Sequence, residues 1–145
     1  EMKVKTLREN REDGVNKAVL RATEFCIEEG ANSSVILPSD IPLIKPLDID
    51  NLLAIGDYGR SVVMTPSSKL DGTNALFRCP PMVMKTYYDN YSFNLHYKEA
   101  INLRLNFNLY LSNRIMLDLD SSDDIQKFIE INSNTLTYDF LKHIL

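Results

Sequence analysis

A chain of 145 residues is long enough for one domain with a sizeable hydrophobic core. Its hydrophobic fraction of 44% and charged fraction of 25% are typical of a globular protein, and its net charge of −4 argues against broad binding to nucleic acid or to an anionic membrane. No apolar run reaches the roughly 18 residues that span a bilayer. Two separated cysteines, Cys26 and Cys79, and only two histidines predict reduced thiols, a cytoplasmic location and no histidine-based zinc site.

The first predicted elements are a strand, a helix and a second strand. Residues 4–7 form a short β-rich run. Apolar residues at 3.6 spacing then predict a helix that begins at Asp13 or Gly14 and ends at Gly30. A second β-rich run follows at 34–37 and is stopped by a Pro-Ser-Asp turn. This order is the beginning of an alternating α/β pattern.

The middle of the chain continues the alternation. Asp48 is positioned to cap a helix whose apolar residues recur at helical spacing. Strands are predicted at 61–65 and 74–77, separated by a turn-rich segment and followed by a Pro-Pro break. Residues 92–103 predict the next helix. The turn before 74–77 carries Asp-Gly-Thr-Asn directly against an apolar run.

The last third predicts two strands and two helices. The strands lie at 107–110 and 115–118, and Asp120 or Ser121 caps the helix that follows. Residues 135–145 are weakly helical in pattern. Strands that alternate with helices predict a single α/β domain with a mostly parallel sheet, in which ligands bind beyond the carboxyl ends of the strands.

Three carboxylates follow predicted strands. Asp118 and Asp120 share one face of the run RIMLDLD, and Asp40 follows the strand at 34–37. Two carboxylates on one face can share a hard cation such as Mg²⁺. The alternatives are structural: Asp120 caps the next helix, and Asp40 shapes the turn before Pro42.

Two segments predict anion binding. Gly72, Thr73 and Asn74 offer backbone N–H groups and a hydroxyl, and Ser92 stands at a predicted helix N-terminus, where N–H groups favour anions. Each also has a plain reading, as a turn and as a helix cap. His96 is interpreted as a hydrogen-bonded structural residue. The motifs of P-loop NTPases, dinucleotide-binding proteins and α/β-hydrolases are missing from the sequence.

Five segments, taken in order, resemble one family over nearly the whole chain up to about residue 130. They are EDGVNKAVLRA, ILPSDIPLI, VVMTPSSKLDGTNALF, YDNYSFNLH and IMLDLDSSDDI. Together they resemble 2-phospho-L-lactate guanylyltransferase, the nucleotidyltransferase of coenzyme F420 biosynthesis. The combination of GTNALF with LDLDSSDDI is fairly specific, whereas PSDIPLI is shared with wider guanylyl- and cytidylyltransferases.

The resemblance implies a fold and a reaction. The fold is an α/β, Rossmann-like three-layer sandwich of the nucleotide-diphospho-sugar transferase, or glycosyltransferase-A, type. The reaction joins GTP to 2-phospho-L-lactate, giving lactyl-2-diphospho-5′-guanosine and pyrophosphate, and some relatives prefer phosphoenolpyruvate. The expected partners are therefore GTP and a phosphoacid, with a possible homodimer.

The resemblance also implies site residues. Asp40 and Asp118 are expected to be catalytic and, with Asp120, to hold Mg²⁺. Thr73 and Ser92 are expected to receive the carboxylate of the acid. The neighbours Gly72, Asn74 and Asp89 complete the implied substrate site, and Gly14 and Asn16 correspond to the Gly-Leu-Asn of the family and are expected near the nucleotide.

The sequence departs from the family pattern in three places. Asp89 stands where the family usually has a glycine whose N–H meets the carboxylate. The glycine-rich run before Thr73 is thinned to Lys69-Leu70-Asp71-Gly72, in which Lys69 could offset the charge of Asp71. The chain also has no match to the first βαβα segment of the family, so residues 1–145 are expected to be one domain that is incomplete at its N-terminus.

Two alternative functions stay open. One is another nucleotidyltransferase of the same fold, acting on a molybdenum-cofactor precursor or a sugar phosphate. The other is a non-catalytic protein that binds a phosphoacid or only a partner protein. The pairing of Thr73 with Ser92 favours a small carboxylic acid over a sugar as the acceptor.

Overall fold

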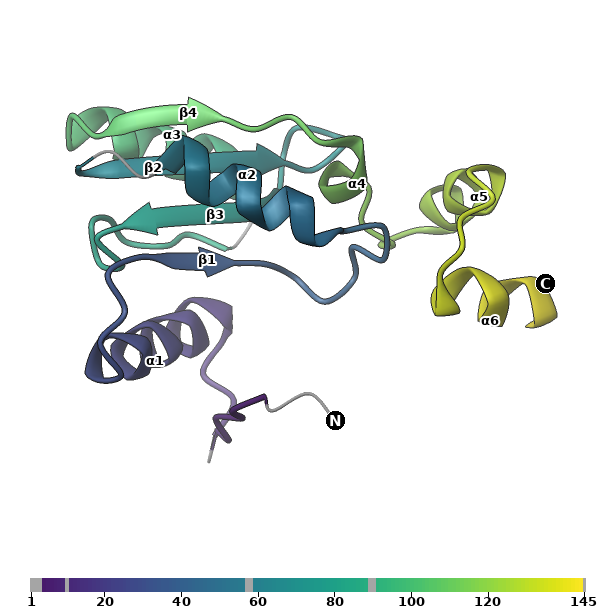
Figure 1. Ribbon diagram of the computed structural model, residues 1–145, viewed down its shortest axis with the longest axis horizontal. Coiled ribbons are helices and arrows are strands. Elements are labelled where there is room, and N and C mark those ends of the chain that lie inside the picture. Colours follow the sequence, from purple (N-terminus) through teal and green to yellow (C-terminus); the bar gives the residue numbers. More distant parts are fainter. Residues whose placement is uncertain (1–3, 10, 57–58, 89–90, 145) are drawn as a thin grey trace.

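The computed structural model describes residues 4–9, 11–56, 59–88 and 91–144. Four strands and six helices follow one another in this part of the chain (Figure 1). In chain order they are α1 (Val15–Glu28), β1 (Ser34–Ile36), α2 (Pro46–Gly56), β2 (Ser61–Pro66), β3 (Thr73–Cys79), α3 (Ser92–Asn102), β4 (Asn106–Leu109), α4 (Asn113–Met116), α5 (Ser122–Glu130) and α6 (Leu136–Ile144).

The four strands form one mixed sheet in the order β1-β3-β2-β4. β3 is antiparallel to both of its neighbours, and β2 pairs in parallel only with β4. The prediction of a mostly parallel sheet is therefore wrong for two of the three strand pairs. The reason is the length of the β2–β3 connection: residues 67–72 are too few for the crossover that a parallel pair needs.

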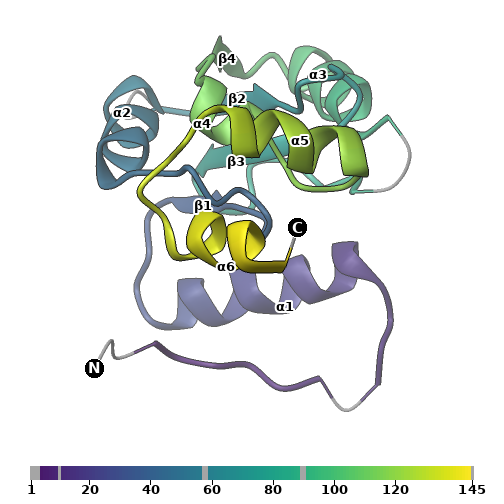
Figure 2. The same cartoon turned by 90° about the vertical axis from the view of Figure 1, so that its right-hand side faces the viewer.

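Helices cover both faces of the sheet, which gives three layers. Figure 2 shows α2 on one side of the sheet and α3 on the other. On the α2 side, Leu52 packs with Val63 and Phe77, and on the α3 side, Ala100 packs with Met64 and Leu76. All six residues of β2 are buried, because this strand lies inside the sheet with both of its faces covered.

One edge of the sheet gathers the segments that the sequence marked as functional. β1, β2 and β4 run in the same direction, so the carboxyl ends of β1 and β2 lie beside the amino end of the antiparallel β3. Asp40, the 67–72 connection and Thr73 follow directly from these ends. Figure 1 shows α4, α5 and α6 beyond the same edge.

Two predicted strands are not strands in the structure. Residues 4–7 have no regular structure, and their side chains are exposed, because no described strand lies beside them to complete a ladder. The predicted strand at 115–118 begins inside the short helix α4, and residues 117–120 continue without pairing. Burial nevertheless alternates at the start of residues 117–120, where Leu117 is buried and Asp118 is partly buried.

The remaining predicted elements are confirmed with small shifts of their ends. α1 begins after Gly14 and is followed by Gly30, and both glycines have the positive φ that favours this residue at helix ends. Ser121 caps α5 by accepting a hydrogen bond from the Asp124 N–H. Ser92 begins α3, but it is the first helical residue, and the cap position belongs to Tyr91.

Asp48 has a larger structural role than the predicted cap. It is the third residue of α2, is fully buried and accepts the Lys45 N–H at 3.0 Å, as the acidic residue of a capping box does. Its carboxylate also accepts two hydrogen bonds from Arg114, at 2.7 and 2.8 Å, and one each from the hydroxyls of Tyr110 and Ser112. Asp48 thus ties α2 to the segment between β4 and α4.

Candidate active site

A β-bulge at the start of β3 directs the side chains of two consecutive residues to different partners. Thr65 pairs with Ala75, whereas Pro66 pairs with Thr73, so Asn74 is the additional residue in the ladder. Thr73 therefore takes the position that faces α3. The Asn74 amide donates instead to the carbonyl of Ile115, at 3.0 Å, on the other side of the sheet edge.

Thr73, Ser92 and His96 form a buried hydrogen-bonded cluster. The Ser92 hydroxyl donates to Thr73 Oγ1 at 3.2 Å, and His96 Nδ1 lies 2.9 Å from the same oxygen. The backbone N–H of Tyr87 donates to His96 Nε2 at 2.8 Å, so the ring proton is on Nδ1 and is donated to Thr73. Thr73 Oγ1 accepts twice, which leaves its own hydrogen for a third group.

Burial keeps His96 neutral. Its ring is fully buried, and desolvation, followed by the nearby charge of Arg78, lowers its pKa to about 4. Both ring nitrogens are engaged in the neutral form, so His96 orients the Thr73 hydroxyl and has no free nitrogen to act as a general base. The sequence-based interpretation of His96 as a structural residue is consistent with this geometry, although its contact with Thr73 was not foreseen.

Asn16 lies next to this cluster. Its Oδ1 accepts the N–H of Tyr88 at 2.8 Å, one peptide beyond the N–H that binds His96. The segment before α3 therefore joins the start of α1 to the buried cluster. Gly14, the other residue expected near the nucleotide, is exposed at the N-terminus of α1.

The 67–72 connection is held rigidly beside the cluster. Ser67 Oγ donates to Asp71 at 2.8 Å, the Gly72 N–H donates to both side chains, and the Phe93 N–H of α3 donates to the Asp71 carbonyl. Leu70 has a φ of 61°, a conformation that costs a non-glycine residue free energy. This strained position lies three residues before Thr73, in the run Lys69-Leu70-Asp71-Gly72.

The predicted carboxylates lie at the same edge of the sheet. The Leu119 N–H donates to the Asp40 carbonyl at 3.1 Å and joins the two acidic segments. Burial raises the pKa of Asp118, and the charges of Asp120 and Asp40 raise it further, while its own backbone and the Asn74 amide act in the opposite direction. The three carboxylates are thus within electrostatic range of one another.

These carboxylates suit a divalent cation by their chemistry. Oxygen ligands are those that Mg²⁺ prefers, and a cation would relieve the repulsion that raises the pKa of Asp118. In the present arrangement, no three Asp, Glu, His or Cys side chains within the described ranges are close enough to hold a metal ion. The assignment of Mg²⁺ to Asp40, Asp118 and Asp120 stays a prediction.

Lys69 is placed differently from the expectation. Its Nζ lies 3.3 Å from the buried carboxylate of Asp124 in α5, and this contact is the first cause of its raised pKa. The charges of Asp118 and Asp120 also raise the pKa of Lys69, so Lys69 lies within electrostatic range of the acidic segment. Its effect on Asp71 is minor, since the hydrogen bond from Ser67 is the main cause of the lowered pKa of Asp71.

The structure brings most of the predicted site residues to one edge of the sheet. Thr73 and Ser92 are in direct contact, and Asn74 joins them to the segment that leads to Asp118. The Gly72 N–H instead donates within its own connection, to Ser67 and Asp71. Asp89 lies outside the described residues. Sequence reasoning missed the contribution of the Tyr87 and Tyr88 backbone, which carries no side-chain signal.

The fold itself is known in solved structures. A crystal structure from Desulfovibrio desulfuricans G20, described as a nucleotide-diphospho-sugar transferase, matches 90% of this chain and 59% of its own with a TM-score of 0.70 and 15% identity. The fold is therefore α/β of the nucleotide-diphospho-sugar transferase class, which is glycosyltransferase-A-like. At this identity the likeness concerns the fold alone.

The sequence model of the family described as "Guanylyl transferase CofC like" matches residues 1–145, and the chain belongs to this family. A phosphoenolpyruvate guanylyltransferase of Rubrobacter xylanophilus is 32% identical over 114 residues, which is 79% of this chain and 56% of the relative. A 2-phospho-L-lactate guanylyltransferase of Methanocaldococcus vulcanius is 31% identical over 144 residues, which is 99% of this chain and 63% of the relative.

This chain spans about three fifths of the length of these relatives. A second Methanocaldococcus protein, the 2-phospho-L-lactate guanylyltransferase of Methanocaldococcus sp. (strain FS406-22), is 33% identical over 143 residues, which is 98% of this chain and 60% of the relative. Within the described ranges, no helix has the length and apolar character needed to cross a bilayer.

Proposed function

We propose that this protein takes part in guanylyl transfer from GTP to 2-phospho-L-lactate or phosphoenolpyruvate, as in the biosynthesis of coenzyme F420. The product with 2-phospho-L-lactate would be lactyl-2-diphospho-5′-guanosine, and pyrophosphate would leave. Family membership and relatives named for both acceptors support this proposal. The chain spans about three fifths of those relatives, and the proposal rests on the part that it shares with them.

The observation that carries the proposal is the meeting of two kinds of groups at the Thr73–Asn74 bulge. Thr73 faces the buried donors of Ser92 and His96, and Asn74 reaches the segment that leads to Asp118. A carboxylate acceptor would be oriented by the donors on one side of the bulge. Its phosphate would then lie toward the acidic side chains on the other side.

The reaction needs positioning more than acid–base catalysis. The phosphate of the acceptor is already anionic at neutral pH, so its oxygen can attack the α-phosphorus of GTP without a general base. This fits a site whose histidine has both nitrogens engaged. Asp40, Asp118 and Asp120 would hold Mg²⁺, which when bound supplies charge neutralisation between the two anions.

Within this chain, the donors around Thr73 would determine which oxygen of the acceptor points toward the α-phosphorus of GTP. The Thr73 hydroxyl accepts from Ser92 and His96, so its own hydrogen is held in one direction. A carboxylate that receives this hydrogen is fixed against rotation, and the attacking phosphate oxygen keeps one orientation. The Thr73 hydroxyl would thus bind the carboxylate of the acceptor, and the buried Ser92 and His96 would orient that hydroxyl.

The test is a pyrophosphate-release assay with GTP and Mg²⁺ on this protein. Asp118→Asn is expected to lower turnover by about 100- to 1,000-fold, because a ligand of the charge-neutralising cation is lost. The matched control is Asp123→Asn, since Asp123 is an exposed residue in the first turn of α5. Wild-type turnover in Asp118→Asn with an intact fold would remove the carboxylate assignment.

A panel of acceptors tests the substrate class in the same assay. 2-Phospho-L-lactate and phosphoenolpyruvate are expected to react, and mannose 1-phosphate is expected to fail because it has no carboxylate for the Thr73 hydroxyl. Thr73→Val is expected to raise KM for the acceptor by about tenfold and to leave KM for GTP nearly unchanged. A sugar phosphate that reacts best would favour a sugar-phosphate nucleotidyltransferase instead.

A further inference from the structure

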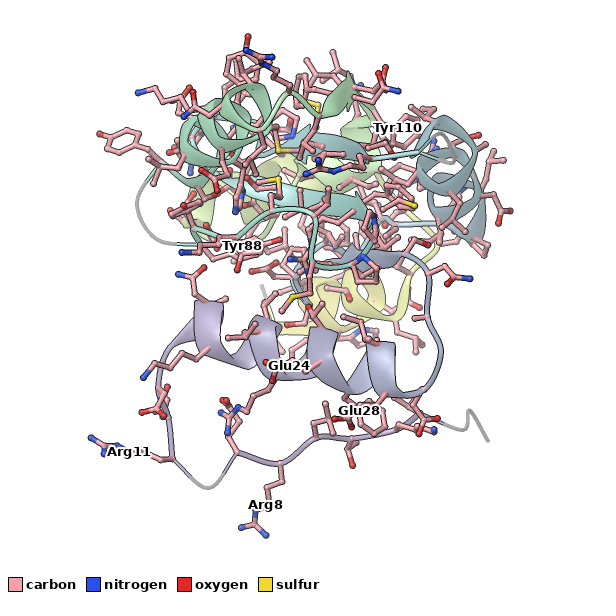
Figure 3. The ribbon with its side chains drawn as sticks, turned by 90° about the vertical axis from the view of Figure 1, so that its left-hand side faces the viewer. Arg8, Arg11, Glu24, Glu28, Tyr88 and Tyr110 are labelled. Carbon is pink, nitrogen blue, oxygen red and sulfur yellow. The ribbon has the colours of Figure 1, made fainter. Side chains whose placement is uncertain are left out.

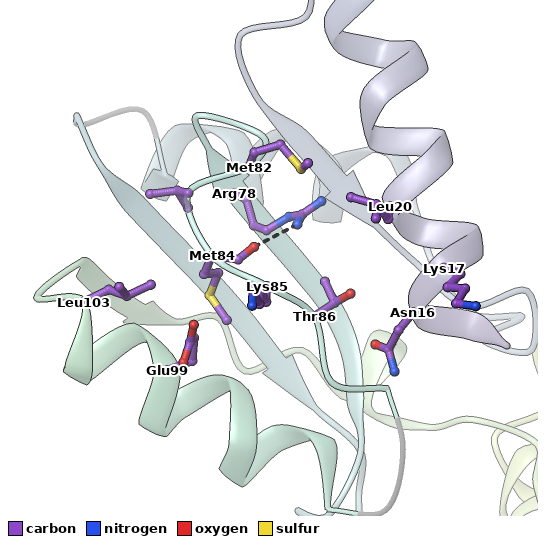
Figure 4. Close-up of a pocket in the computed structure, with 11 residues that line it drawn as sticks. Asn16, Lys17, Leu20, Arg78, Met82, Met84, Lys85, Thr86, Glu99 and Leu103 are labelled. Atoms are coloured by element: carbon purple, nitrogen blue, oxygen red, sulfur yellow. Dashed lines mark hydrogen bonds between the residues drawn. The ribbon is translucent and has the colours of Figure 1, made fainter. Parts of the chain in front are cut away.

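Several positive side chains of this protein lie away from the three predicted metal-binding carboxylates. Figure 3 shows Arg8 and Arg11 on the side of α1 that faces away from the sheet, and both are exposed. Lys17, Arg78 and Lys85 line a cavity of about 580 Å³ between α1, the end of β3 and α3 (Figure 4). None of the three carboxylates lines this cavity. A cation that serves the carboxylates must therefore come from another part of the chain.

Lys69 lies beside the carboxylates and contacts α5. Its Nζ is 3.3 Å from Oδ2 of Asp124, a buried carboxylate in the first turn of that helix. The charges of Asp118 and Asp120 act on the same ammonium group and raise its pKa further. The Lys69 side chain is 54% exposed, and an ammonium group has three hydrogens to donate. Lys69 can therefore reach a ligand from solvent while it keeps its contact with Asp124.

The connection between β2 and β3 places Lys69 between the two parts of the candidate site. On the α3 side, the Phe93 N–H donates to the Asp71 carbonyl at 3.1 Å. On the side of the carboxylates, the Ser68 N–H donates to the Met116 carbonyl at 2.8 Å. These contacts hold the backbone before and after Lys69. Its side chain therefore begins at a defined position, between the donors proposed for the acceptor carboxylate and the acidic side chains.

The charge of the acceptor favours a cation at this position. 2-Phospho-L-lactate and phosphoenolpyruvate carry their phosphate on the carbon next to the carboxylate, so a carboxylate bound at Thr73 brings the phosphate close to the acidic side chains. A single Mg²⁺ would carry fewer positive charges than the negative charges that three carboxylates and a phosphate bring together. A lysine within electrostatic range of the same carboxylates offsets part of this excess.

We propose that the Lys69 ammonium group binds the phosphate of the phosphoacid acceptor, while the Thr73 hydroxyl binds its carboxylate. The inference rests on the proposed function and names the residue that receives the second anionic group of the same acceptor. An ammonium group is a compact charge with several donors, so it can bind a phosphate oxygen without a fixed orientation. An acceptor held at both anionic groups keeps its attacking oxygen in one place.

The test is isothermal titration calorimetry of the wild type and Lys69→Met with 2-phospho-L-lactate, phosphoenolpyruvate and GTP, each added alone in the presence of Mg²⁺. Methionine keeps an unbranched side chain and removes the charge. The variant is expected to bind both phosphoacids about tenfold more weakly, and to bind GTP within about twofold of the wild type. Lys69→Arg keeps a positive charge and is expected to bind the phosphoacids within about threefold of the wild type.

Lys127→Met is the matched control. The Lys127 Nζ lies 3.7 Å from Oδ1 of Asp124, so both variants remove a lysine from the same buried carboxylate. The two lysine side chains are also similarly exposed, at 54% and 58%. Urea denaturation is expected to give similar midpoints for the two variants, whereas Lys127→Met should bind both phosphoacids within about twofold of the wild type. This difference separates a binding role of Lys69 from a structural one.

Unchanged phosphoacid affinity in Lys69→Met would overturn this inference and leave the proposed guanylyl transfer in place. Weaker binding of GTP alone would also overturn it, because Lys69 would then contact the phosphates of the nucleotide. An equal loss of phosphoacid affinity in Lys69→Met and Lys127→Met would assign the loss to the charge around α5 and not to a contact of Lys69. A wild type that binds neither phosphoacid would instead reject the acceptor class of the proposed function, and this inference with it.

Discussion

Asp48 and Asp118 are the same residue type in opposite surroundings. The Asp48 carboxylate is fully buried and accepts hydrogen bonds from Arg114, Tyr110, Ser112 and the Lys45 backbone, with Arg114 as the main cause of its strongly lowered pKa. The pKa of Asp118 is instead raised, by burial and by other carboxylates. A carboxylate that is fully hydrogen-bonded and paired with a positive charge stabilises the fold. A carboxylate buried near other carboxylates is instead available to a cation or substrate.

The same contrast separates two arginines, the partly exposed Arg114 and the buried Arg78. The Arg114 guanidinium forms a bidentate pair with Asp48, with hydrogen bonds of 2.7 and 2.8 Å. Arg78 is more deeply buried and has only neutral acceptors, with Nε left open. The completed pair joins α2 to the segment between β4 and α4, whereas Arg78 is held between neutral groups, and burial lowers its pKa.

The largest effect on stability is expected from replacing the fully paired carboxylate of Asp48. Asp48→Asn removes the charge that Arg114 pairs with, and should lower the free energy of unfolding by about 3 kcal/mol at pH 7. Urea denaturation measures this loss. Asp50→Asn, on the exposed side of α2, is the control and should change stability little. A loss below about 0.5 kcal/mol in Asp48→Asn would contradict the structural role.

The pH dependence of folding stability tests the role of Asp48 and also that of His96. The pKa of Asp48 is lowered by folding, so its contribution to stability is present above its ordinary pKa of 3.8 and is lost as the pH falls below that value. The pKa of His96 is also lowered, to about 4, so below pH 6.5 the unfolded chain binds a proton that the folded chain does not. Stability should therefore fall by roughly 3 kcal/mol between pH 6.5 and pH 4.

His96→Gln is expected to remove much of the fall between pH 6.5 and pH 4 at the cost of lower stability at pH 7. Urea denaturation at several pH values measures both changes. His143→Gln is the matched control, because His143 is exposed in α6. An unchanged pH profile in His96→Gln would mean that His96 is not the group that titrates.

The smallest effect on stability is expected for Asp118→Asn, which should stabilise the fold, whereas Asp48→Asn should destabilise it. Because folding raises its pKa, ionised Asp118 destabilises the folded state at neutral pH, and Asp118→Asn should raise Tm by about 1–2 °C. The measurement is thermal unfolding without added metal at pH 7. The difference from wild type should shrink as the pH falls and Asp118 becomes protonated. A clear drop in Tm at pH 7 would place Asp118 with Asp48 as a structural carboxylate.

Local patterns predicted the elements that their own residues define. The glycines around α1, the Ser121 cap of α5 and the apolar run of β2 gave the right type of structure because each acts within a few residues. The strand expected at 115–118 failed for the opposite reason. Its alternation is that of a strand, but this segment meets no partner edge, and Ile115 and Met116 complete the turn of α4.

The sequence by itself determined the family, the helices and strands with local signals, and the residue types of the candidate site. Only the tertiary structure decided the antiparallel direction of β3, the bulge that directs Thr73 toward Ser92 and His96, and which buried charges are paired. The physical reason is range: caps and periodicity are interactions between near neighbours in the chain, whereas hydrogen bonds such as Asn74 to Ile115, Arg114 to Asp48 and Arg78 to Thr23 join residues that only folding brings together.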